Sequence, residues 1–414
     1  MRIIISRHII FFLCLCLPNI LFAGNDERRQ LVDALNETLA QKDTAYLKPY
    51  LSETFSISIL SGNSVQNYLD QIVKHSETAT GVSYVTDSTD VSGNVSLKVI
   101  FREPSQTIES IIGLNKENKI TYIDYLDRLF GQSRHTESHL VTTIPFELLD
   151  NQLMLIHLKL NDLPHSLPFY LDTGADGMGI SRLAADSLLL NTDETQNATV
   201  VGGQIEVQLS RGNKIHLGGV SFQNQSIGIF KEPVAEGVVG IIGLPIVREY
   251  ITRIDFNKQE IQLYNFGEYA FETAGEVLDI TMRNNLISLP ASINMVGEKE
   301  VKGKFILDTG AHYHFIGFAP FVGKNRLLFS GFKATGKSTT TSLGISTPVY
   351  EGQMHEFKIG QSISIKNMPV SLQLSQAGIN PELSPDGSIG IHLLKQYNIT
   401  IDMLRKKIHF IPNK

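Results

Sequence analysis

From about residue 140 onward, this 414-residue chain repeats itself. The stretch LDTGADGMGI at 171–180 has a second copy, LDTGAHYHFI, at 307–316. A hairpin pattern precedes each copy, and an apolar-apolar-glycine element follows it, starting at Gly240 in the first half and at Gly387 in the second. Because the repeated units consist of strand and turn patterns, the chain is predicted to fold into two similar β-rich lobes.

The rest of this region is also predicted to be mainly β. Short runs of β-branched residues are separated by glycine, asparagine and proline, which is typical of strands joined by turns. One short helix is expected at 181–190, where the sequence is SRLAADSLLL.

Residues 25–135 have a different pattern, which predicts a small α+β domain. Two helices are expected first, one with leucines four residues apart and one with Ser64 as its N-cap. Strands follow, and the last two, at 108–114 and 120–125, flank a polar turn. The apolar positions that define these elements are Leu31, Leu35 and Leu39 in the first helix and Leu97, Val99 and Phe101 in a strand.

The first residues are typical of a secretory signal peptide. Arg2 and Arg7 precede an apolar stretch at 9–17 that is short for a membrane span, and Ala23 is a small residue at which a signal peptidase would cut. We therefore expect a signal peptide over 1–23 and a periplasmic or secreted mature protein without a stable membrane span. An uncleaved membrane anchor is the alternative.

Composition narrows the chemistry of the mature chain. Both cysteines, Cys14 and Cys16, lie in the signal segment, so neither disulfides nor thiolate nucleophiles are expected. The net charge is −6, and cleavage of the signal segment would make it more negative, because the charged residues of that segment are all basic. Nucleic acid is therefore not an expected partner, and we expect neither a cofactor nor a metal.

The paired LDTGA motifs and their glycine elements resemble the aspartic protease superfamily, and ADG after the first motif is most similar to its retropepsin branch. The resemblance covers roughly residues 140–412. It implies two retropepsin-like β lobes in a pseudo-twofold arrangement, over 138–270 and 271–414, behind an α+β domain at 24–137. Because one chain holds both lobes, it also implies a catalytic unit that can work as a monomer on a peptide or protein substrate.

Pseudo-twofold pairing of the two turns would bring Asp172 and Asp308 together as a catalytic pair. Two carboxylates a few ångströms apart cannot both ionise cheaply, so they would share a proton in the acidic range. The ionised partner can take a proton from water while the protonated one polarises an amide carbonyl, which is general acid-base hydrolysis. The expected activity is that of an exported aspartic endopeptidase.

Neighbouring residues are expected to support this pair. Gly174 and Gly310 let backbone amides approach the carboxylates. The resemblance implies that the hydroxyls of Thr173 and Thr309 bridge the two lobes. It also implies that Asp176 lies where a residue binds the substrate backbone.

A hairpin that covers the substrate is expected at 200–207, with Gly202 and Gly203 at its tip. An ordinary surface hairpin is the alternative. In the second half, the corresponding interval GFKATGKSTTTS at 331–342 is polar and is expected to be mobile.

The sequence departs from the retropepsin pattern in two places. Leu244 and Ile391 stand where retropepsins have an arginine, so the arginine-to-aspartate support of the active-site loop is expected to be missing. His312, Tyr313 and His314 follow the second motif, and a cationic His312 would lower the pKa of a neighbouring aspartate unless its side chain points away.

Two motifs are interpreted as coincidental. The stretch GFKATGKS at 331–338 fits the phosphate-binding loop pattern, but the β-branched residues after it predict a strand where that loop needs a helix. His312 and His314 share a strand face and, with Asp308, would provide only thin support for a metal site.

Two other functions fit parts of the sequence. A catalytically silent relative would bind a peptide or another ligand between the lobes, and it predicts that an aspartate turns away or that the two carboxylates lie too far apart. Alternatively, the N-terminal domain is the active part, which predicts a polar, enclosed pocket between residues 25 and 135. Its order of two helices followed by a sheet is similar to the cone-shaped domains of the nuclear-transport-factor-2-like superfamily. We expect it to be a spacer or docking module, and dimerisation through it stays open.

Overall fold

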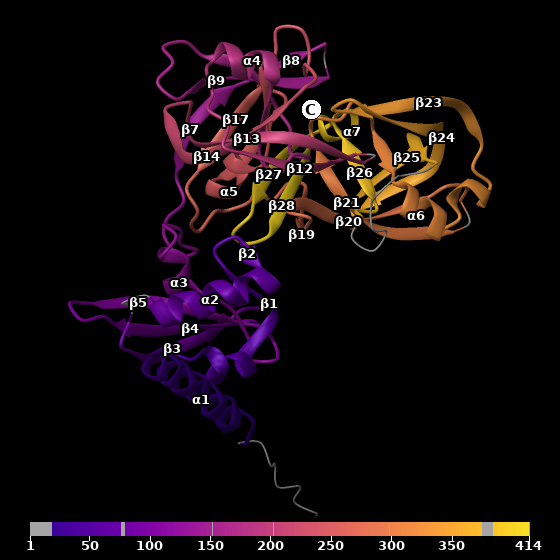
Figure 1. The fold of residues 1–414 in the computed structure, drawn as a ribbon. Coiled ribbons are helices and arrows are strands. Elements are labelled where there is room, and N and C mark those ends of the chain that lie inside the picture. The colour runs from indigo at the N-terminus through magenta and orange to yellow at the C-terminus, as the bar shows by residue number, and fades with distance from the viewer. Residues whose placement is uncertain are drawn as a thin grey trace, which may run out of the picture. The chain divides into compact units, whose positions relative to one another are not determined.

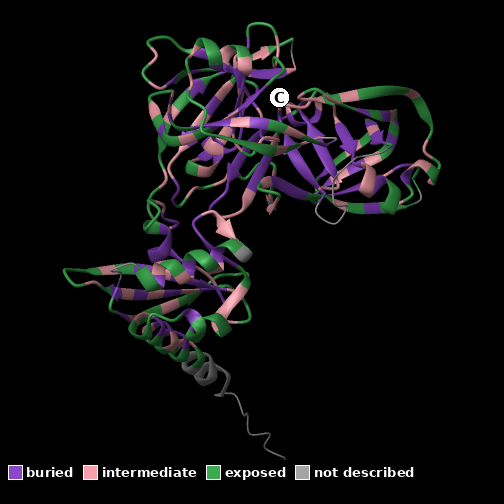
Figure 2. Cartoon of the chain, in the orientation of Figure 1, coloured by how far each residue is buried: buried purple, intermediate pink, exposed green. Residues whose placement is uncertain are grey.

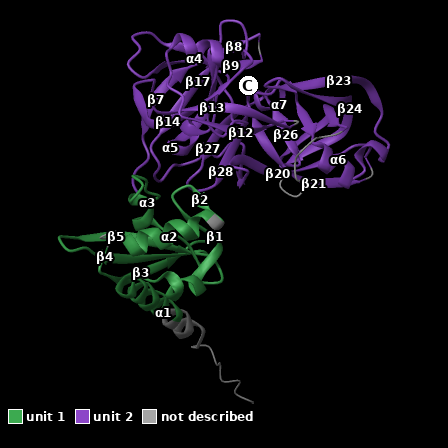
Figure 3. Ribbon diagram, in the orientation of Figure 1, with its two compact units in different colours: residues 1–135 green, residues 136–414 purple. Residues whose placement is uncertain are grey.

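The computed structural model describes residues 19–75, 79–150, 152–201, 203–297, 299–374 and 384–413; for Asn63 and residues 19–26 it describes the backbone only. Strands make up 52% of the chain and helices 17%, so the fold is mainly β, as predicted. The chain divides into two compact units, one ending at His135 and the other beginning at Thr136 (Figures 1 and 3). Buried residues fill the interior of each unit (Figure 2).

Unit 1, up to His135, is a mixed sheet covered by helices. Its strand order is β2-β1-β6-β5-β4-β3, and β1 runs parallel to β6. The apolar stripes of α1 and α2 share one core with the sheet. The elements are α1 (Asn19–Gln41), η1 (Thr44–Tyr46), η2 (Lys48–Tyr50), β1 (Leu51–Ile57), β2 (Leu60–Ser61), α2 (Asn63–His75), β3 (Gly81–Thr89), β4 (Val95–Arg102), β5 (Thr107–Leu114), β6 (Ile120–Ile123) and α3 (Asp124–Arg128).

The sequence pattern predicted the core positions of unit 1 but not every boundary. Leu31 and Leu35 of α1 are buried, as are the three alternating residues expected in β4. Ser64 lies inside α2 rather than at its N-cap, and its hydroxyl donates to the Ser61 carbonyl at 3.0 Å. The last strand ends two residues earlier than predicted, because Asp124 begins helix α3.

The expected signal peptide falls largely on residues outside the described part, since description begins at Asn19. Within the described part of the chain, no helix combines the length and the hydrophobicity that crossing a bilayer requires.

Unit 2, from Thr136, contains two eight-stranded sheets with the same strand order. The first is β12-β13-β14-β11-β15-β10-β9-β8, and the second, read from the same end, is β23-β24-β25-β22-β26-β21-β20-β19. Even the additional pairing recurs, β13 with β9 in the first and β24 with β20 in the second. The duplication seen in the sequence is therefore a duplication of strand topology.

A third sheet of unit 2 takes strands from both halves. Its order is β18-β28-β27-β16-β17-β7, and β16 pairs with β27 at the centre. The order reads the same from either edge when each strand is replaced by its equivalent in the other half. This shared sheet joins the two halves through backbone hydrogen bonds.

The strands and helices of the first half of unit 2 are β7 (Leu140–Pro145), β8 (Glu147–Leu149), β9 (Leu153–Leu160), β10 (Leu167–Leu171), β11 (Met178–Ser181), α4 (Arg182–Ser187), β12 (Glu194–Val200), β13 (Gly203–Leu217), β14 (Val220–Phe230), β15 (Gly240–Ile242), α5 (Pro245–Glu249), β16 (Ile251–Asp255) and β17 (Glu260–Tyr264). The second half contains β18 (Glu276–Asp279), β19 (Thr281–Arg283), β20 (Leu286–Asn294), β21 (Glu300–Asp308), β22 (Phe315–Gly317), α6 (Ala319–Lys324), η3 (Leu327–Phe329), β23 (Ala334–Ser342), β24 (Ile345–Ile359), β25 (Ile363–Gln373), β26 (Gly387–Gly390), α7 (Ile391–Leu394), β27 (Tyr397–Asp402) and β28 (Lys407–Pro412). The helix expected at 181–190 is α4, which is shorter than predicted and is capped by the Ser181 side chain.

Candidate active site

Asp172 and Asp308 occupy equivalent places at the ends of two strands. Asp172 directly follows β10, and Asp308 is the last residue of β21. The repeated glycine elements run beside them, because β10 pairs in parallel with β15 and β21 pairs in parallel with β26. In each half, the fold therefore brings together the two motifs that recur in the sequence.

The threonines of the two motifs connect the halves by reciprocal hydrogen bonds. The Thr173 N–H donates to Thr309 Oγ1 at 3.0 Å, and the Thr309 N–H donates to Thr173 Oγ1 at 3.1 Å. Each hydroxyl also donates across the boundary, Thr173 to the Leu307 carbonyl and Thr309 to the Leu171 carbonyl, both at 2.8 Å. Both threonines are fully buried. The hydroxyls thus lie where the resemblance implied, between the two halves.

The glycines of the motifs allow each turn to approach the opposite aspartate. The Gly174 N–H donates to Asp172 Oδ1 at 2.8 Å, and the Gly310 N–H donates to Asp308 Oδ1 at 3.1 Å. A Cβ on Gly174 would lie 2.6 Å from Asp308 Cγ, and one on Gly310 would lie 2.4 Å from Asp172 Cγ. Any larger residue would push the opposite carboxyl group away, so glycine is required for the pair to meet.

The two carboxyl groups lie close together, because each lies against the glycine of the opposite motif. Asp308 is buried, at 9% exposed, and Asp172 is partly buried. Burial raises the pKa of both groups, and the charge of Asp172 raises that of Asp308 further. A pair of this kind holds one proton over a range in which isolated aspartates would both be ionised.

Asp176 has an arginine partner that the sequence analysis missed. The Arg248 guanidinium pairs with the Asp176 carboxylate and also donates to the Asp176 carbonyl at 2.9 Å. Asn285, from the second half, donates its amide to the same carboxylate at 3.1 Å. The expectation of missing arginine support was wrong for the first half, because Arg248 lies on α5 one helical turn after Leu244 and reaches the same loop.

The predicted hairpin at 200–207 is formed by β12 and β13, in which Val200 pairs with Gly203. Gly202 lies outside the described residues. Val201 packs against an apolar cluster of the second half, and a Cβ on Gly203 would lie 2.9 Å from Ile345 Cδ1. The tip therefore contacts the second half beside Tyr313, which packs on the same cluster.

The second half has a matching hairpin where a mobile polar segment was expected. Residues 334–342 form strand β23, which pairs with β24 up to the turn at Leu343 and Gly344. A Cβ on Gly344 would lie 3.1 Å from Glu232 Cγ of the first half. The phosphate-loop pattern is accordingly part of a strand that leads into another strand, and the interpretation as coincidence holds.

Of the three residues expected to lie near the aspartate pair after the second motif, only Tyr313 is affected by the charge of Asp308. Tyr313 lies near Asp308, and burial together with the Asp308 charge raises the pKa of its hydroxyl well above the usual value. Partial burial lowers the pKa of His312 and of His314. Within the described residues, no cluster of side chains suitable for a metal ion is found.

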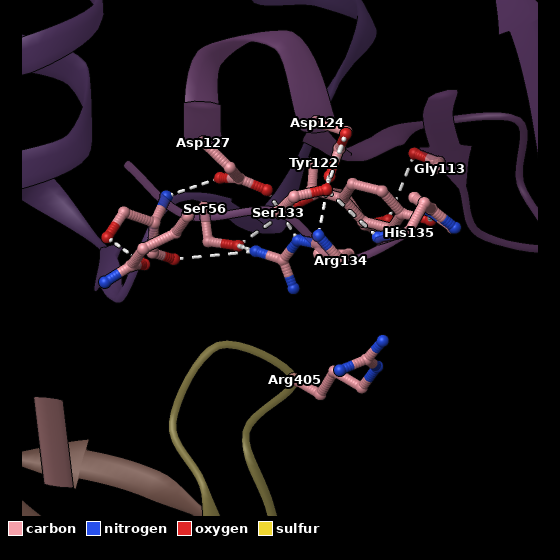
Figure 4. Close-up of polar contacts among 12 residues, drawn as sticks. Ser56, Gly113, Tyr122, Asp124, Asp127, Ser133, Arg134, His135 and Arg405 are labelled. Carbon is pink, nitrogen blue, oxygen red and sulfur yellow. Dashed lines mark hydrogen bonds and ion pairs between the residues drawn. The ribbon is translucent and has the colours of Figure 1, made fainter. Parts of the chain in front are cut away.

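Unit 1 holds a separate network of buried charges near its last residues (Figure 4). Arg134 pairs with Asp127, with 2.7 Å between Nε and Oδ2, and its guanidinium lies over the Tyr122 ring at 4.5 Å. The Arg134 N–H donates to Asp124 at 2.6 Å, and the Ser58 N–H donates to Asp127 at 2.5 Å. These contacts fasten residues 133–135 to α3 and β1.

The cavity found in unit 1 does not match the polar pocket that an active N-terminal domain would need. It lies between the helices and the sheet, and aliphatic and aromatic side chains such as Leu35, Leu69 and Phe101 form most of its lining. It is small and contributes to the core of the unit rather than to a polar site.

Residues 156–246 match a family model described as aspartyl protease. The matched range runs from β9 into α5, so it contains Asp172, Gly243 and the first hairpin. This match supports an aspartyl protease domain and, in general, a protease activity. A comparison with curated proteins gave no match.

Proposed function

We propose that this protein is an aspartic endopeptidase and that Asp172 and Asp308 are its catalytic residues. The single observation that carries the proposal is the arrangement of the two motifs, in which reciprocal hydrogen bonds between the threonines bring the two carboxyl groups close together. The family match on the first half supports the same chemistry. A silent binding protein predicted a turned or distant aspartate, and neither is seen.

The paired carboxyl groups supply both proton transfers of peptide hydrolysis. With one proton between them, the ionised carboxylate takes a proton from water as its oxygen attacks the amide carbon, and the protonated group donates to the carbonyl oxygen. The tetrahedral intermediate then collapses, the carbon–nitrogen bond breaks, and the amine leaves with the proton that came from water. The proton on the carbonyl oxygen returns to the pair, which restores its starting state.

We assign substrate binding to the region around the two hairpins. A peptide would lie between Asp172 and Asp308 on one side and the described part of the hairpin tip, at Gly203, on the other. Asp176 would accept a hydrogen bond from a substrate amide. Its side chain is 48% exposed while paired with Arg248, which leaves lone pairs accessible.

The proposal also includes the arrangement of the two lobes, the type of the N-terminal domain and export. The equal strand orders and the shared sheet support two retropepsin-like lobes in a pseudo-twofold arrangement, so that one chain forms the whole site. The helices and sheet of unit 1 support a cone-like domain similar to the nuclear-transport-factor-2-like superfamily, acting as a spacer, docking or dimerising module. Export rests on residues 1–23, and a mature N-terminus at Gly24, read by mass spectrometry, would test it.

The proposed activity is tested with a diverse peptide library and the purified chain lacking residues 1–23, from about pH 3 to about pH 8. Internal cleavage detected by mass spectrometry is expected for the wild type and is expected to disappear in Asp172→Asn and in Asp308→Asn. Cleavage that survives either substitution would overturn the assignment. A folded wild-type protein that cleaves no peptide would overturn the activity itself.

A further inference from the structure

The duplication is broken at two positions beside Asp308. Ser388 of β26 pairs with Ile306, whereas at the equivalent place in the first half Ile241 of β15 pairs with Tyr170. The second difference lies in the loops after the motifs, where Tyr313 takes the place that Gly177 holds in the first half. Two positions that have no hydroxyl in one half have one in the other.

Both side chains lie beside the same carboxyl group. Ser388 is fully buried, and its Oγ donates to Asp308 Oδ2 at 3.2 Å. The Tyr313 hydroxyl lies close enough to Asp308 for the Asp308 charge to raise its pKa. The Tyr313 ring packs against the cluster of Ile306, Ile316, Phe318 and Val349.

Asp172 has no such pair of donors, because isoleucine and glycine occupy the equivalent places. Its Oδ1 accepts the Gly174 N–H, as Asp308 Oδ1 accepts the Gly310 N–H. Each aspartate therefore accepts the N–H of the glycine in its own motif, whereas the side-chain contacts of the two aspartates differ. This asymmetry is unexpected in a site built from a duplicated motif.

We propose that Ser388 and Tyr313 are positioning residues that hold Asp308 Oδ2 and stabilise the singly ionised form of the aspartate pair. The inference rests on the proposed function, since the singly ionised pair is the form that activates water. It goes beyond the features that the two halves share, because both residues lie at positions where the two copies of the repeat differ.

The physical reason is the direction of the hydrogen bonds. Burial disfavours the charge on the pair, and hydroxyls that donate to a carboxylate favour it. For Asp308, the Ser388 hydrogen bond opposes the increase in pKa that burial causes. Without the two hydroxyls, the pair would take up a second proton at a higher pH, and activity on the acid side would fall.

The first test uses Tyr313→Phe and Ser388→Ala, singly and combined, with Tyr397→Phe as a matched control in β27. In the proposal, the acid limb of kcat/KM against pH moves to higher pH by about half a unit to one unit, which lowers kcat/KM on that limb roughly three- to tenfold. Tyr397→Phe should leave the limb in place. An acid limb that does not move in the folded variants would overturn the proposal.

A second readout needs no catalytic activity. The carboxyl carbons of the aspartates in the full chain are followed by NMR against pH, and Asp172→Asn and Asp308→Asn assign the signals. We expect the lower apparent pKa of the pair to rise in Tyr313→Phe; an unchanged titration contradicts the proposal. If the wild type cleaves no peptide, the proposed function fails while this titration still decides the role of the hydroxyls. If Ser388→Ala does not fold, Tyr313→Phe decides it.

Discussion

Thr173 and Thr309 each donate a backbone N–H to the hydroxyl oxygen of the other, at 3.0 and 3.1 Å, across the boundary between the two halves of unit 2. Since each threonine directly follows an aspartate, these two reciprocal hydrogen bonds fix the separation of the two carboxyl groups. The site is therefore positioned by short, buried threonine side chains bonded to backbone groups rather than by long, flexible side chains.

Removing one of these hydroxyls should destabilise unit 2. In Thr309→Val, the buried Thr173 N–H and the Leu171 carbonyl lose their partner, and each unsatisfied group costs about 1–3 kcal/mol. We expect a loss of about 2–6 kcal/mol in the free energy of unfolding, measured by calorimetry of the full chain. Thr252→Val is the matched control, because buried Thr252 makes one local bond to the Tyr250 carbonyl. An equal loss in both variants would contradict the role of the bridge.

Breaking the Arg248–Asp176 ion pair should lower kcat/KM, by loosening the loop after Asp172, more than it lowers the free energy of unfolding. Both side chains are partly exposed, so Arg248→Met is expected to cost no more than about 1 kcal/mol. The loop after Asp172 would lose its tie to α5, and kcat/KM should fall more than stability does. Arg211→Met, which breaks the exposed pair with Glu194, is the control. Unchanged kcat/KM in Arg248→Met would show that the pair does not support the site.

The same pair illustrates what the sequence could predict. The two motifs and their glycine elements carry their structure locally, in turns that need glycine and in strands that precede the aspartates, so the pairing of Asp172 with Asp308 followed from the pattern. Arg248 was missed because the expected position, Leu244, lies one helical turn earlier, and only the α5 helix shows that both residues face the same loop.

Contacts between distant strands were also beyond the pattern. Ser388 donates to Asp308 because β26 lies beside β21, and nothing in the local sequence of Ser388 indicates this contact. The segment 331–342 was expected to be mobile since it is polar, but residues 334–342 form a strand, because threonines favour strands and β24 offers a partner along their length. Polarity alone therefore did not distinguish a loop from an exposed strand.

The raised pKa of the buried pair predicts a cost in stability at neutral pH. A carboxyl group whose pKa is raised by folding stabilises the fold below its unfolded pKa of about 3.9, and that contribution is lost as the pH rises through the folded pKa. Asp308→Asn should therefore unfold at a higher temperature than the wild type near pH 7, and the gain should vanish near pH 3. The control is Asp162→Asn, at an exposed aspartate. A gain that does not depend on pH would contradict this account.

In unit 1, Arg134→Met should leave a buried charge without its partner. Asp127 is fully buried, and burial raises its pKa while Arg134 opposes the increase. Breaking such a pair costs about 3–5 kcal/mol, so hydrogen exchange in β1 and α3 should become faster. Arg128→Met should have a smaller effect, because Arg128 is 37% exposed and Asp124 keeps its bonds to Ser133 and Arg134. Equal exchange in both variants would contradict the importance of the buried pair.

The most direct test of the central claim, that Asp172 and Asp308 act as one unit, is kcat/KM on a cleaved peptide for Asp172→Asn, Asp308→Asn and the double variant. Residues that act as a unit are not additive, so each single substitution should cost roughly as much as both together. Equal losses of about a thousandfold or more in all three variants are the predicted result. Independent losses that multiply in the double variant, or activity retained in either single variant, would show that the two aspartates do not form one catalytic pair.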